Sequence, residues 1–414
     1  MCKKSKFTVI DLFCGAGGLS EGFLSAGCDL IAHVEMDKDA CDTIRTRMAY
    51  HTLRRTGKLG EYRKYLLGKI DRETLVHNNN LEKEFDSVIQ AEISQDNIKD
   101  LIMDVKKRLG DGRLDMIIGG PPCQAYSHIG RSSDKKRMRR DKRKFLYQYY
   151  VEFLRAFRPK LFVFENVPGL LNAGGGVYLK NMRQMMKRAG YTTDYQVFNT
   201  SDFGVPQNRK RIILIGWRRD SGISQYPNFE TVKRTYKVAD FIGDLPKLHA
   251  GEGSKCVSYQ SRSSLLRRLG ITDRELPLII DHSARPQSRR DLEIYKIAVK
   301  KKNYGRNIRY NELPEKLKTH KNRTAFLDRF KVVDHLAPAS HTIIAHIAKD
   351  GHYYIHPDIK QNRSLTVREA ARLQTFPDNY FFEGTKTSKF KQIGNAVPPM
   401  FSKLVAEELI HLLK

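Results

Sequence analysis

Short apolar runs alternate with helix-like stretches along the first half of the chain. Buried strands are predicted at residues 7–13, 30–34, 88–93, 116–118, 161–164 and 212–215. Helices are predicted from Leu19 to Ala26, where Gly27 follows as a stop, and from Phe145 to Phe157. Strands that alternate with helices form βαβ units. The pattern therefore predicts an α/β fold with an open sheet.

This rhythm stops near Arg218 and resumes near Ser364. The chain between them is polar and basic, and Pro, Gly and Ser recur in it. We predict a second, smaller, loop-rich domain at residues 218–363, set into a body made of residues 1–217 and 364–414. The closing part is expected to hold a helix over Val367–Leu373 and an amphipathic helix that runs through Leu413. A basic stretch at residues 50–85 predicts a helical insertion with a solvated face.

One loop is the first candidate for chemistry, the run from Gly119 to Ser127, which follows a predicted strand. Its two glycines permit a sharp turn and close approach of a ligand, and its two prolines stiffen the backbone. Cys123 is therefore held beyond a strand end, where open α/β sheets bind ligands. A cysteine thiolate is a strong nucleophile. From this loop alone, a buried structural cysteine fits equally well.

The first predicted strand runs into Gly15-Ala16-Gly17-Gly18, and a helix follows. Strand, glycine turn and helix form a nucleotide-binding arrangement, although the spacing differs from that of the dinucleotide fingerprint. The second strand ends in Glu35. An acidic residue there is suited to hydrogen bonds with ribose hydroxyls. Together these features favour an adenosine-containing cofactor over a plain turn.

Polar residues also follow the later strands. Glu165 stands at the tip of one of them and is a candidate acid or hydrogen-bonding group, with helix capping as the plainer alternative. Arg209 and Arg211 precede the last strand; taken alone, they are interpreted as surface charges. The run from Gly394 to Pro399, taken alone, is interpreted as a plain turn.

The formal net charge of +28 over 414 residues indicates a polyanionic partner, with nucleic acid first and an anionic membrane second. A basic run from Arg131 to Lys144 lies just beyond Cys123 and suggests phosphate contacts. None of the six cysteines forms a C-x-x-C pair, which argues against zinc and disulfide frameworks. The sequence shows neither a signal peptide nor an apolar run of membrane-spanning length, so an intracellular protein is expected.

Taken together, these stretches resemble the DNA cytosine-5 methyltransferases, and the resemblance covers nearly the whole chain. The matching motifs occur in the family's order: Asp11–Gly18, Gly119–Ser127, Glu165–Val167, Gln207–Arg211, Arg368–Gln374 and Gln392–Asn395. The resemblance implies a methyltransferase variant of the doubly wound sheet. It also implies that the loop-rich segment is a target-recognition domain.

The resemblance also implies roles for individual residues. The implied catalytic residues are Cys123, Glu165, Arg209 and Arg211. The implied cofactor contacts are Phe13, Gly15, Gly17, Gly18, Glu35, Met36, Glu92, Ile93, Pro121, Leu146, Asn395 and Ala396. The cofactor would be S-adenosylmethionine, with S-adenosylhomocysteine as its product and no metal. The partner would be double-stranded DNA, and the enzyme is expected to be a monomer in a bacterial cytoplasm.

The sequence departs from the family pattern at two places. The family usually has an Asp near the end of the third strand, where it contacts the adenine; here the matching residue is Glu92. The stretch at residues 50–85 also makes the distance from Glu35 to Glu92 longer than is usual in the family.

The implied reaction explains the residue types. Attack of the Cys123 thiolate on carbon 6 would turn cytosine into an enamine-like nucleophile at carbon 5. Glu165 would stabilise the charge at ring nitrogen 3, and Arg211 with Arg209 would hold the exocyclic oxygen. The base would have to be flipped out of its stack. Three hypotheses follow: modification of duplex DNA within a restriction-modification system, an RNA methyltransferase on the same scaffold, and a non-catalytic DNA-binding regulator. The long second domain argues against the RNA enzyme, and the pairing of Cys123 with Glu165 argues against the regulator.

Overall fold

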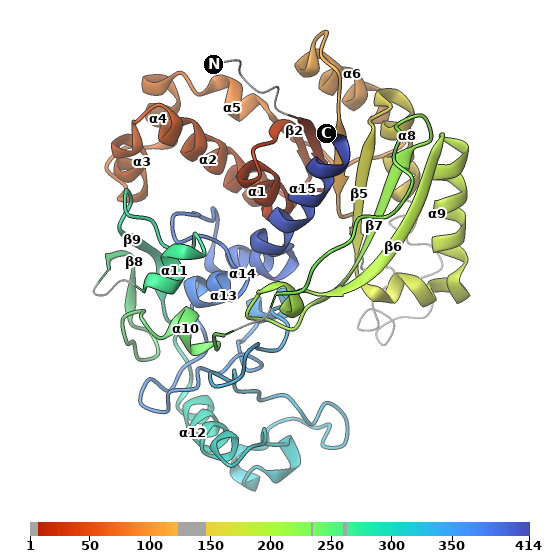
Figure 1. Cartoon of the computed structure of the whole chain (residues 1–414). Helices are drawn as coiled ribbons and strands as arrows, with labels where there is room; N and C mark the ends of the chain where they lie inside the picture. Colours follow the sequence, from red (N-terminus) through yellow and green to blue (C-terminus); the bar gives the residue numbers. More distant parts are fainter. Residues whose placement is uncertain (1–6, 123–145, 233–234, 260–262) are drawn as a thin grey trace.

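A seven-stranded sheet forms the centre of the molecule (Figure 1). The computed structural model describes residues 7–122, 146–232, 235–259 and 263–414. The strands of this sheet are β1 (Thr8–Leu12), β2 (Asp29–Glu35), β3 (Val88–Gln90), β4 (Met116–Gly119), β5 (Leu161–Asn166), β6 (Tyr191–Asn199) and β7 (Lys210–Arg218). Their spatial order is β3-β2-β1-β4-β5-β7-β6. The first five are parallel, and β7 runs antiparallel to both of its neighbours.

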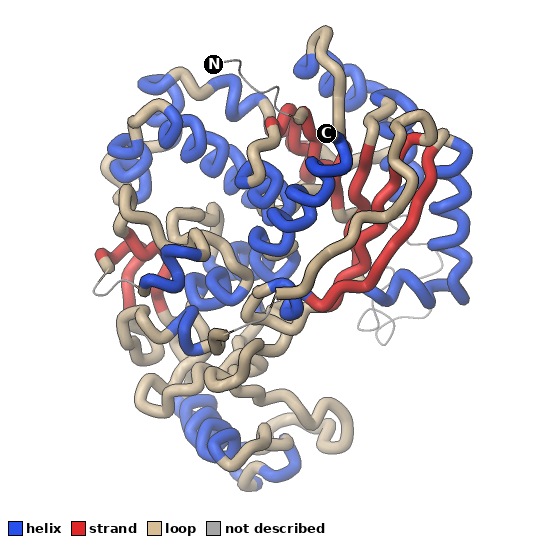
Figure 2. The backbone as a smooth tube through the Cα atoms, viewed as in Figure 1, coloured by secondary structure: helices blue, strands red, loops and turns tan. Residues whose placement is uncertain are grey.

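Helices cover both faces of this sheet (Figures 1 and 2). The helices are α1 (Gly18–Ser25), α2 (Lys38–Arg55), α3 (Leu59–Leu66), α4 (Arg72–Asn79), α5 (Glu82–Asp86), α6 (Ile98–Leu109), α8 (Leu146–Phe157), α9 (Val177–Arg188), α10 (Ala239–Ile242), α11 (Ser264–Arg268), α12 (Arg289–Asn303), α13 (Val367–Leu373), α14 (Lys386–Asn395) and α15 (Pro399–Leu413). One apolar core packs α6, α8 and α9 against the sheet, and a second packs α1 and α15 against its other face. The predicted doubly wound fold is confirmed.

The sheet contains a strand that the sequence analysis missed. Strand β6 lies at the sheet edge beyond β7, and most of its residues are exposed or only half-buried. Its sequence Tyr-Thr-Thr-Asp-Tyr-Gln-Val-Phe-Asn lacks an apolar run because the faces of this strand are only partly covered, so most of its side chains stay in contact with solvent. The antiparallel partner β7 is buried over most of its length and was predicted.

The insertion at residues 50–85 is helical, as predicted, but its solvated face is only part of its role. Helices α2 to α5 bury apolar side chains such as Leu53, Tyr62 and Leu75 at 1% exposure or less. These side chains share a core with Leu278 and with Phe381. Leu278 belongs to the two-stranded sheet of β8 (Gly253–Ser258) and β9 (Leu278–Ser283). The insertion therefore braces the segment that follows the main sheet.

Residues 218–363 contain short elements and long loops, as the loss of rhythm indicated. Helix α12 and the loops after it form a lobe at the lower end of the view in Figure 1. This lobe has its own apolar core, which runs from Ile294 to Ile355. The earlier part of the segment packs differently, because Val238 and Phe241 share a core with α13 and α14 of the body. Within the described residues, no helix combines the length and apolar character needed to cross a bilayer.

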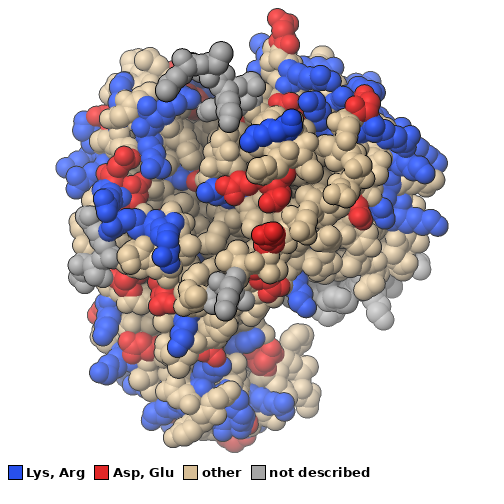
Figure 3. Space-filling view, in the orientation of Figure 1, with Lys and Arg blue, Asp and Glu red and all other residues tan. Residues whose placement is uncertain are grey.

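The excess positive charge is distributed over the surface. Figure 3 shows Lys and Arg side chains on this face over both the α/β body and the lobe that carries α12, with acidic side chains between them. The basic run at residues 131–144 lies outside the described residues, so its predicted phosphate contacts stay a prediction.

Candidate functional site

A cavity of about 450 Å³ opens at the carboxyl ends of the parallel strands. This is the edge of the sheet where α/β proteins of this class bind ligands. Its walls include eleven of the twelve predicted cofactor contacts together with Glu165 and Arg211. The eleven are Phe13, Gly15, Gly18, Glu35, Met36, Glu92, Ile93, Pro121, Leu146, Asn395 and Ala396. The twelfth, Gly17, does not line the cavity.

The turn after β1 shapes one wall of this cavity. Phe13 and Gly15 have positive φ angles of 58° and 54°, so the backbone reverses sharply between strand and helix. At Gly18 a β-carbon would come within 2.2 Å of the Val397 carbonyl oxygen, so α1 can approach this loop only with glycine there. Gly17 has a φ of 74° and precedes α1. It therefore acts on the shape of the turn rather than on the cavity surface.

Glu35 is held in one orientation by backbone donors. Its carboxylate accepts hydrogen bonds from the backbone N–H groups of Gly15 at 2.8 Å, Met36 at 2.8 Å and Asp37 at 2.9 Å. Burial raises the pKa of this carboxyl, while the three hydrogen bonds favour its charged form. The hydrogen bond from Gly15 links the tip of β2 to the glycine turn. It holds Glu35, the residue predicted to bind the ribose, on the cavity wall.

Glu165 and Arg211 meet on the opposite side of the cavity. Arg211 Nε lies 2.7 Å from Glu165 Oε1, and both side chains are only slightly exposed. Gly120 leaves room for this carboxylate, because a β-carbon at that position would lie 2.7 Å from Glu165 Oε2. The interpretation of Arg211 as a surface charge is therefore wrong. Arg211 holds the carboxylate in place at the cavity wall.

The loop that contains Cys123 begins at this same wall. Pro121 and Pro122 line the cavity, and the Pro121 carbonyl accepts a hydrogen bond from the Asn166 side chain at 3.1 Å. Cys123 itself lies outside the described residues. Its predicted role as a nucleophile therefore remains a prediction. The described start of its loop, at Gly120, lies beside the Glu165 carboxylate.

Arg209 is not brought to the cavity. It is fully buried and donates hydrogen bonds to the carbonyl oxygens of Ile343, Gly394 and Asn395 at 2.8–3.3 Å. Neither the surface interpretation nor direct contact with a substrate describes this placement. Side chains alternate between the two faces of a strand, so residues two apart, such as 209 and 211, would point to the same face. Arg209 does not follow this rule because it lies before β7, which begins at Lys210.

The interpretation of residues 394–399 as a plain turn is also wrong. Gly394 and Asn395 are the last two residues of α14, and Asn395 and Ala396 line the cavity. A β-carbon at Gly394 would lie 2.3 Å from the backbone of residues 344–345, so only glycine allows this packing. Arg209 donates to the carbonyls at this point, which fixes the helix end against the wall.

Several residues of the cavity belong to the Asp11–Gly18 and Gln392–Asn395 motifs, but sequence reasoning gave them no individual role. Asp11, Cys14 and Gln392 all line the cavity. Asp11 was passed over because it sits inside an apolar strand, and Cys14 because it looked like part of the glycine turn. Gln392 lies one helical turn before Asn395 on α14, and its amide donates to the Glu383 carbonyl at 2.9 Å. The pairing of i and i+3 residues on one helix face is the signal that could have found it.

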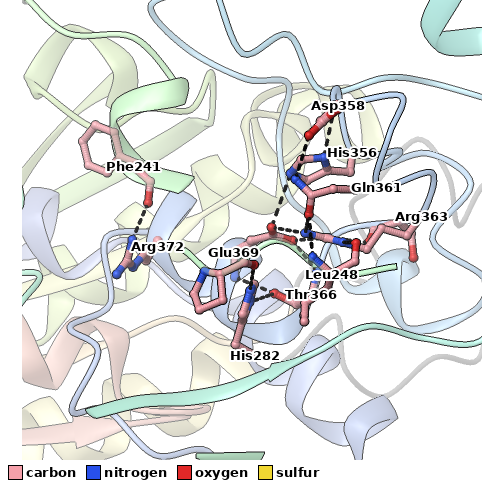
Figure 4. A network of polar contacts seen from close by, with 12 residues as sticks. Phe241, Leu248, His282, His356, Asp358, Gln361, Arg363, Thr366, Glu369 and Arg372 are labelled. Atoms are coloured by element: carbon pink, nitrogen blue, oxygen red, sulfur yellow. Dashed lines mark hydrogen bonds and ion pairs between the residues drawn. The ribbon is translucent and has the colours of Figure 1, made fainter. Parts of the chain in front are cut away.

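The Arg368–Gln374 motif serves a different purpose. Figure 4 shows Glu369 beside Arg363 and His356 in a network of polar contacts. None of these three residues lines the cavity. Arg363 and Glu369 form a pair of hydrogen bonds, both 2.7 Å long, between side chains that are 1% exposed. Glu369 also caps α13, because it accepts from the Thr366 backbone N–H at 2.7 Å. This motif holds the body and the loop-rich segment together.

Comparison with known proteins shows which family the chain resembles. The model of the C-5 cytosine-specific DNA methylase family matches residues 7–71 and 73–411. The chain is 43% identical to the type II methyltransferase M.Bpa9945I of Bacillus paralicheniformis, over 96% of this chain and 97% of that protein. It is 31% identical to the type II methyltransferase M1.HphI of Haemophilus parahaemolyticus, over 98% and 87% of the two chains.

Solved structures share the fold. A prophage-encoded protein of E. coli described as a DNA modification methyltransferase superposes with a TM-score of 0.64, at 23% identity, over 99% of both chains. The Entamoeba histolytica methyltransferase EhMeth superposes with a TM-score of 0.56, at 14% identity, over 99% of this chain and 100% of that one.

Proposed function

The chain belongs to the C-5 cytosine-specific DNA methylase family, and from this premise we propose that it transfers a methyl group from S-adenosylmethionine to carbon 5 of a flipped cytosine in duplex DNA. The observation that carries this proposal is that one cavity at the strand ends contains both predicted sites. It joins the glycine turn and Glu35 on one side to Glu165 and the start of the Cys123 loop on the other. A cofactor site and a base site would therefore share one space.

The cavity wall fits the proposed cofactor. Gly15 has open space where a side chain would stand, which leaves room for a ligand to approach closely, and Glu35 offers fixed acceptors for ribose hydroxyls. Met36, Ile93 and Leu146 supply apolar surface, and Asp11 has a buried oxygen without a hydrogen-bond partner among the described residues. When bound, S-adenosylmethionine supplies an electrophilic methyl group. No set of three His, Cys, Asp or Glu side chains in the described residues is arranged to hold a metal ion.

Cys123 is proposed as the nucleophile. Its thiolate would attack carbon 6 of the base, and the covalent bond would make carbon 5 nucleophilic. Glu165 would face ring nitrogen 3, where a hydrogen bond or proton offsets the charge that develops during the attack. Arg211 orients Glu165 through their 2.7 Å ion pair. Loss of the proton at carbon 5 would then release Cys123.

Arg209 takes a positioning role in this proposal. Its guanidinium is bonded to three backbone carbonyls, so it fixes the end of α14 and the residues that line the cavity there. Arg211 is left as the arginine that can face the exocyclic oxygen of the base.

We further propose that the enzyme is the modification partner of a restriction system and acts as a monomer in a bacterial cytoplasm. The relatives that match over nearly their whole length carry the designation type II methyltransferase. The family description names DNA, which favours DNA over the RNA alternative. Residues 218–363 are proposed to choose the target sequence.

A direct experiment tests this function. The purified chain is incubated with S-adenosylmethionine labelled on its methyl group and with either duplex DNA or tRNA, and incorporated label is counted. We expect label in DNA only. Bisulfite sequencing of plasmid from an expressing host then locates the methylated cytosines. Cys123→Ser should abolish incorporation while DNA binding is kept, because a serine hydroxyl without an adjacent base is a far weaker nucleophile. Incorporation into tRNA alone, or full turnover by the variant, would contradict the proposal.

A further inference from the structure

The proposed reaction gives no role to Asp11, a carboxyl group that lines the cavity from the end of β1. The residue is 0% exposed. Its Oδ2 accepts a hydrogen bond from the Ser20 hydroxyl at 2.6 Å, and its Oδ1 has no hydrogen-bond partner among the described residues. Buried carboxyl oxygens are normally paired, so an unpaired one on a cavity wall is suited to a ligand group.

The surroundings of Asp11 keep it in its neutral form. Burial raises the pKa of Asp11 to about 8, and the charge of Glu35 acts in the same direction, against the hydrogen bond from Ser20. At pH 7 the carboxyl therefore carries a proton. The side chains that contribute most to this shift are Ser20 and Glu35, and neither is a cation.

The other titratable groups nearby supply no compensating charge. Burial raises the pKa values of Cys14 and Tyr150 well above their usual range, so both are neutral. His33, the neighbour of Asp11 on β2, is neutral because burial lowers its pKa to about 4. Arg211 on the cavity wall is already paired with Glu165, and Lys391 is exposed.

The position of Asp11 in the sheet indicates which part of the cofactor it meets. Strand β1 lies between β2 and β4 in the sheet. Strand β2 ends in Glu35, the residue proposed to bind the ribose, and β4 leads to Gly120 and Pro121. A cofactor with its ribose at Glu35 and its reactive end at Glu165 must cross the tip of β1. S-adenosylmethionine carries a permanent positive charge at its sulfur, which is bonded both to the ribose carbon C5′ and to the reactive methyl group. S-adenosylhomocysteine has an uncharged thioether there.

We infer that Asp11 senses the charge of the methyl donor: it gives up its proton when the sulfonium binds, and the resulting carboxylate favours the donor over the spent cofactor. This inference rests on the proposed use of S-adenosylmethionine. The O–H bond of the carboxyl breaks, its electron pair stays on the carboxylate, and the proton passes to the solvent. After methyl transfer the sulfur is neutral, Asp11 takes a proton back, and the product is held less tightly.

The sign of the pH dependence follows. Below about pH 8 Asp11 must lose a proton for the donor to bind, so affinity for S-adenosylmethionine rises as the pH rises toward that value. Above it the carboxylate is already formed, and no proton is released. Affinity for S-adenosylhomocysteine should depend much less on pH over the same range.

Calorimetry of the full chain tests this inference. Binding of each cofactor is measured at pH 7 in two buffers that differ in ionisation enthalpy, and the difference in heat gives the number of protons released. We expect close to one proton for S-adenosylmethionine and much less for S-adenosylhomocysteine. Asp11→Asn should abolish the release and reduce the preference for the donor at least tenfold. Asp111→Asn is the matched control, because it exchanges an exposed carboxylate that does not line the cavity for an amide.

The outcomes separate this inference from the proposed function. Tight binding of S-adenosylmethionine without proton release by the native chain would overturn the role of Asp11 and leave the proposed cofactor intact. An unchanged preference in a folded Asp11→Asn variant would do the same. If neither cofactor binds the native chain, the proposed cofactor and the inference both fall. The native measurement decides the question even if the variant does not fold.

Discussion

Replacing Glu369 by Gln should destabilise the whole molecule without touching the cavity. Glu369 and Arg363 are each 1% exposed and are joined by two hydrogen bonds of 2.7 Å. The substitution leaves the Arg363 guanidinium buried without a negative partner. Removing one member of a buried pair typically costs about 3–5 kcal/mol. For a chain of this length, that loss corresponds to roughly 3–6 °C in melting temperature.

The pH dependence of stability gives an independent check of the same pair. Burial alone would raise the pKa of Glu369, but Arg363, with His356, outweighs it and holds the pKa well below its usual range. A carboxyl with a lowered folded pKa stabilises the fold above its unfolded pKa of about 4.3, and this contribution is lost as the pH falls below that value. The native chain should therefore lose stability faster than Glu369→Gln does when the pH falls from 5 to 3.

Thermal and urea unfolding, followed by circular dichroism, measures both effects. Glu315→Gln is the matched control, since Glu315 contacts Lys318 and Arg323 with a side chain that is 70% exposed. Its melting temperature should stay close to that of the native chain. The network does not stabilise the fold if Glu369→Gln has the same melting temperature as Glu315→Gln. The same conclusion follows if the native chain and Glu369→Gln lose stability equally as the pH falls.

Four further changes test the site and the recognition segment. Glu165→Gln should slow methyl transfer by about 10²-fold or more with little change in DNA affinity. A single-turnover rate equal to that of the native chain would show that a residue other than Glu165 acts as the acid. Glu35→Ala should weaken S-adenosylmethionine binding by roughly 1–3 kcal/mol, as measured by calorimetry. Gly18→Ala forces a β-carbon to within 2.2 Å of the Val397 carbonyl and should destabilise the fold by about 1–3 kcal/mol in urea titration, whereas Gly60→Ala, with open space around it, should not. Grafting residues 218–363 onto a related body should carry the methylated sequence with it, and an active graft that keeps the host sequence would refute that assignment.

The sequence predicted the cavity because its residues follow strand ends. Gly15, Glu35, Gly120 and Glu165 each stand just after an apolar run, and the ends of parallel strands meet at one edge of a sheet. Strand order is not needed for that inference. Asp11 escaped it because the residue lies within its strand, where the pattern gives no sign that one side chain opens onto a cavity.

Buried arginines are what the sequence could not show. Arg209, Arg363, Arg368 and Arg372 are all fully buried, although arginine in a polar stretch normally indicates surface. Their burial is possible because carboxylates and backbone carbonyls inside the fold accept hydrogen bonds from the guanidinium groups. Arg372, for example, is paired with Asp378 at 2.6 Å. Such partners are chosen by the tertiary fold, so no local pattern in the sequence reports them.

Two of these arginines attach the loop-rich segment to the body. Arg368 donates to the Ile280 carbonyl at 2.8 Å and Arg372 to the Phe241 carbonyl at 2.9 Å.

Each of these acceptors is a backbone oxygen of the loop-rich segment, and a backbone oxygen is present whatever side chain the position carries. The exposed side chains of the segment can therefore change without loss of its attachment to the body. The same holds for Arg209, which donates to the Ile343 carbonyl at 2.8 Å and to two carbonyls at the end of α14. One arginine thus ties the segment to the cavity wall, so a poorly seated segment should disturb cofactor binding as well as target choice.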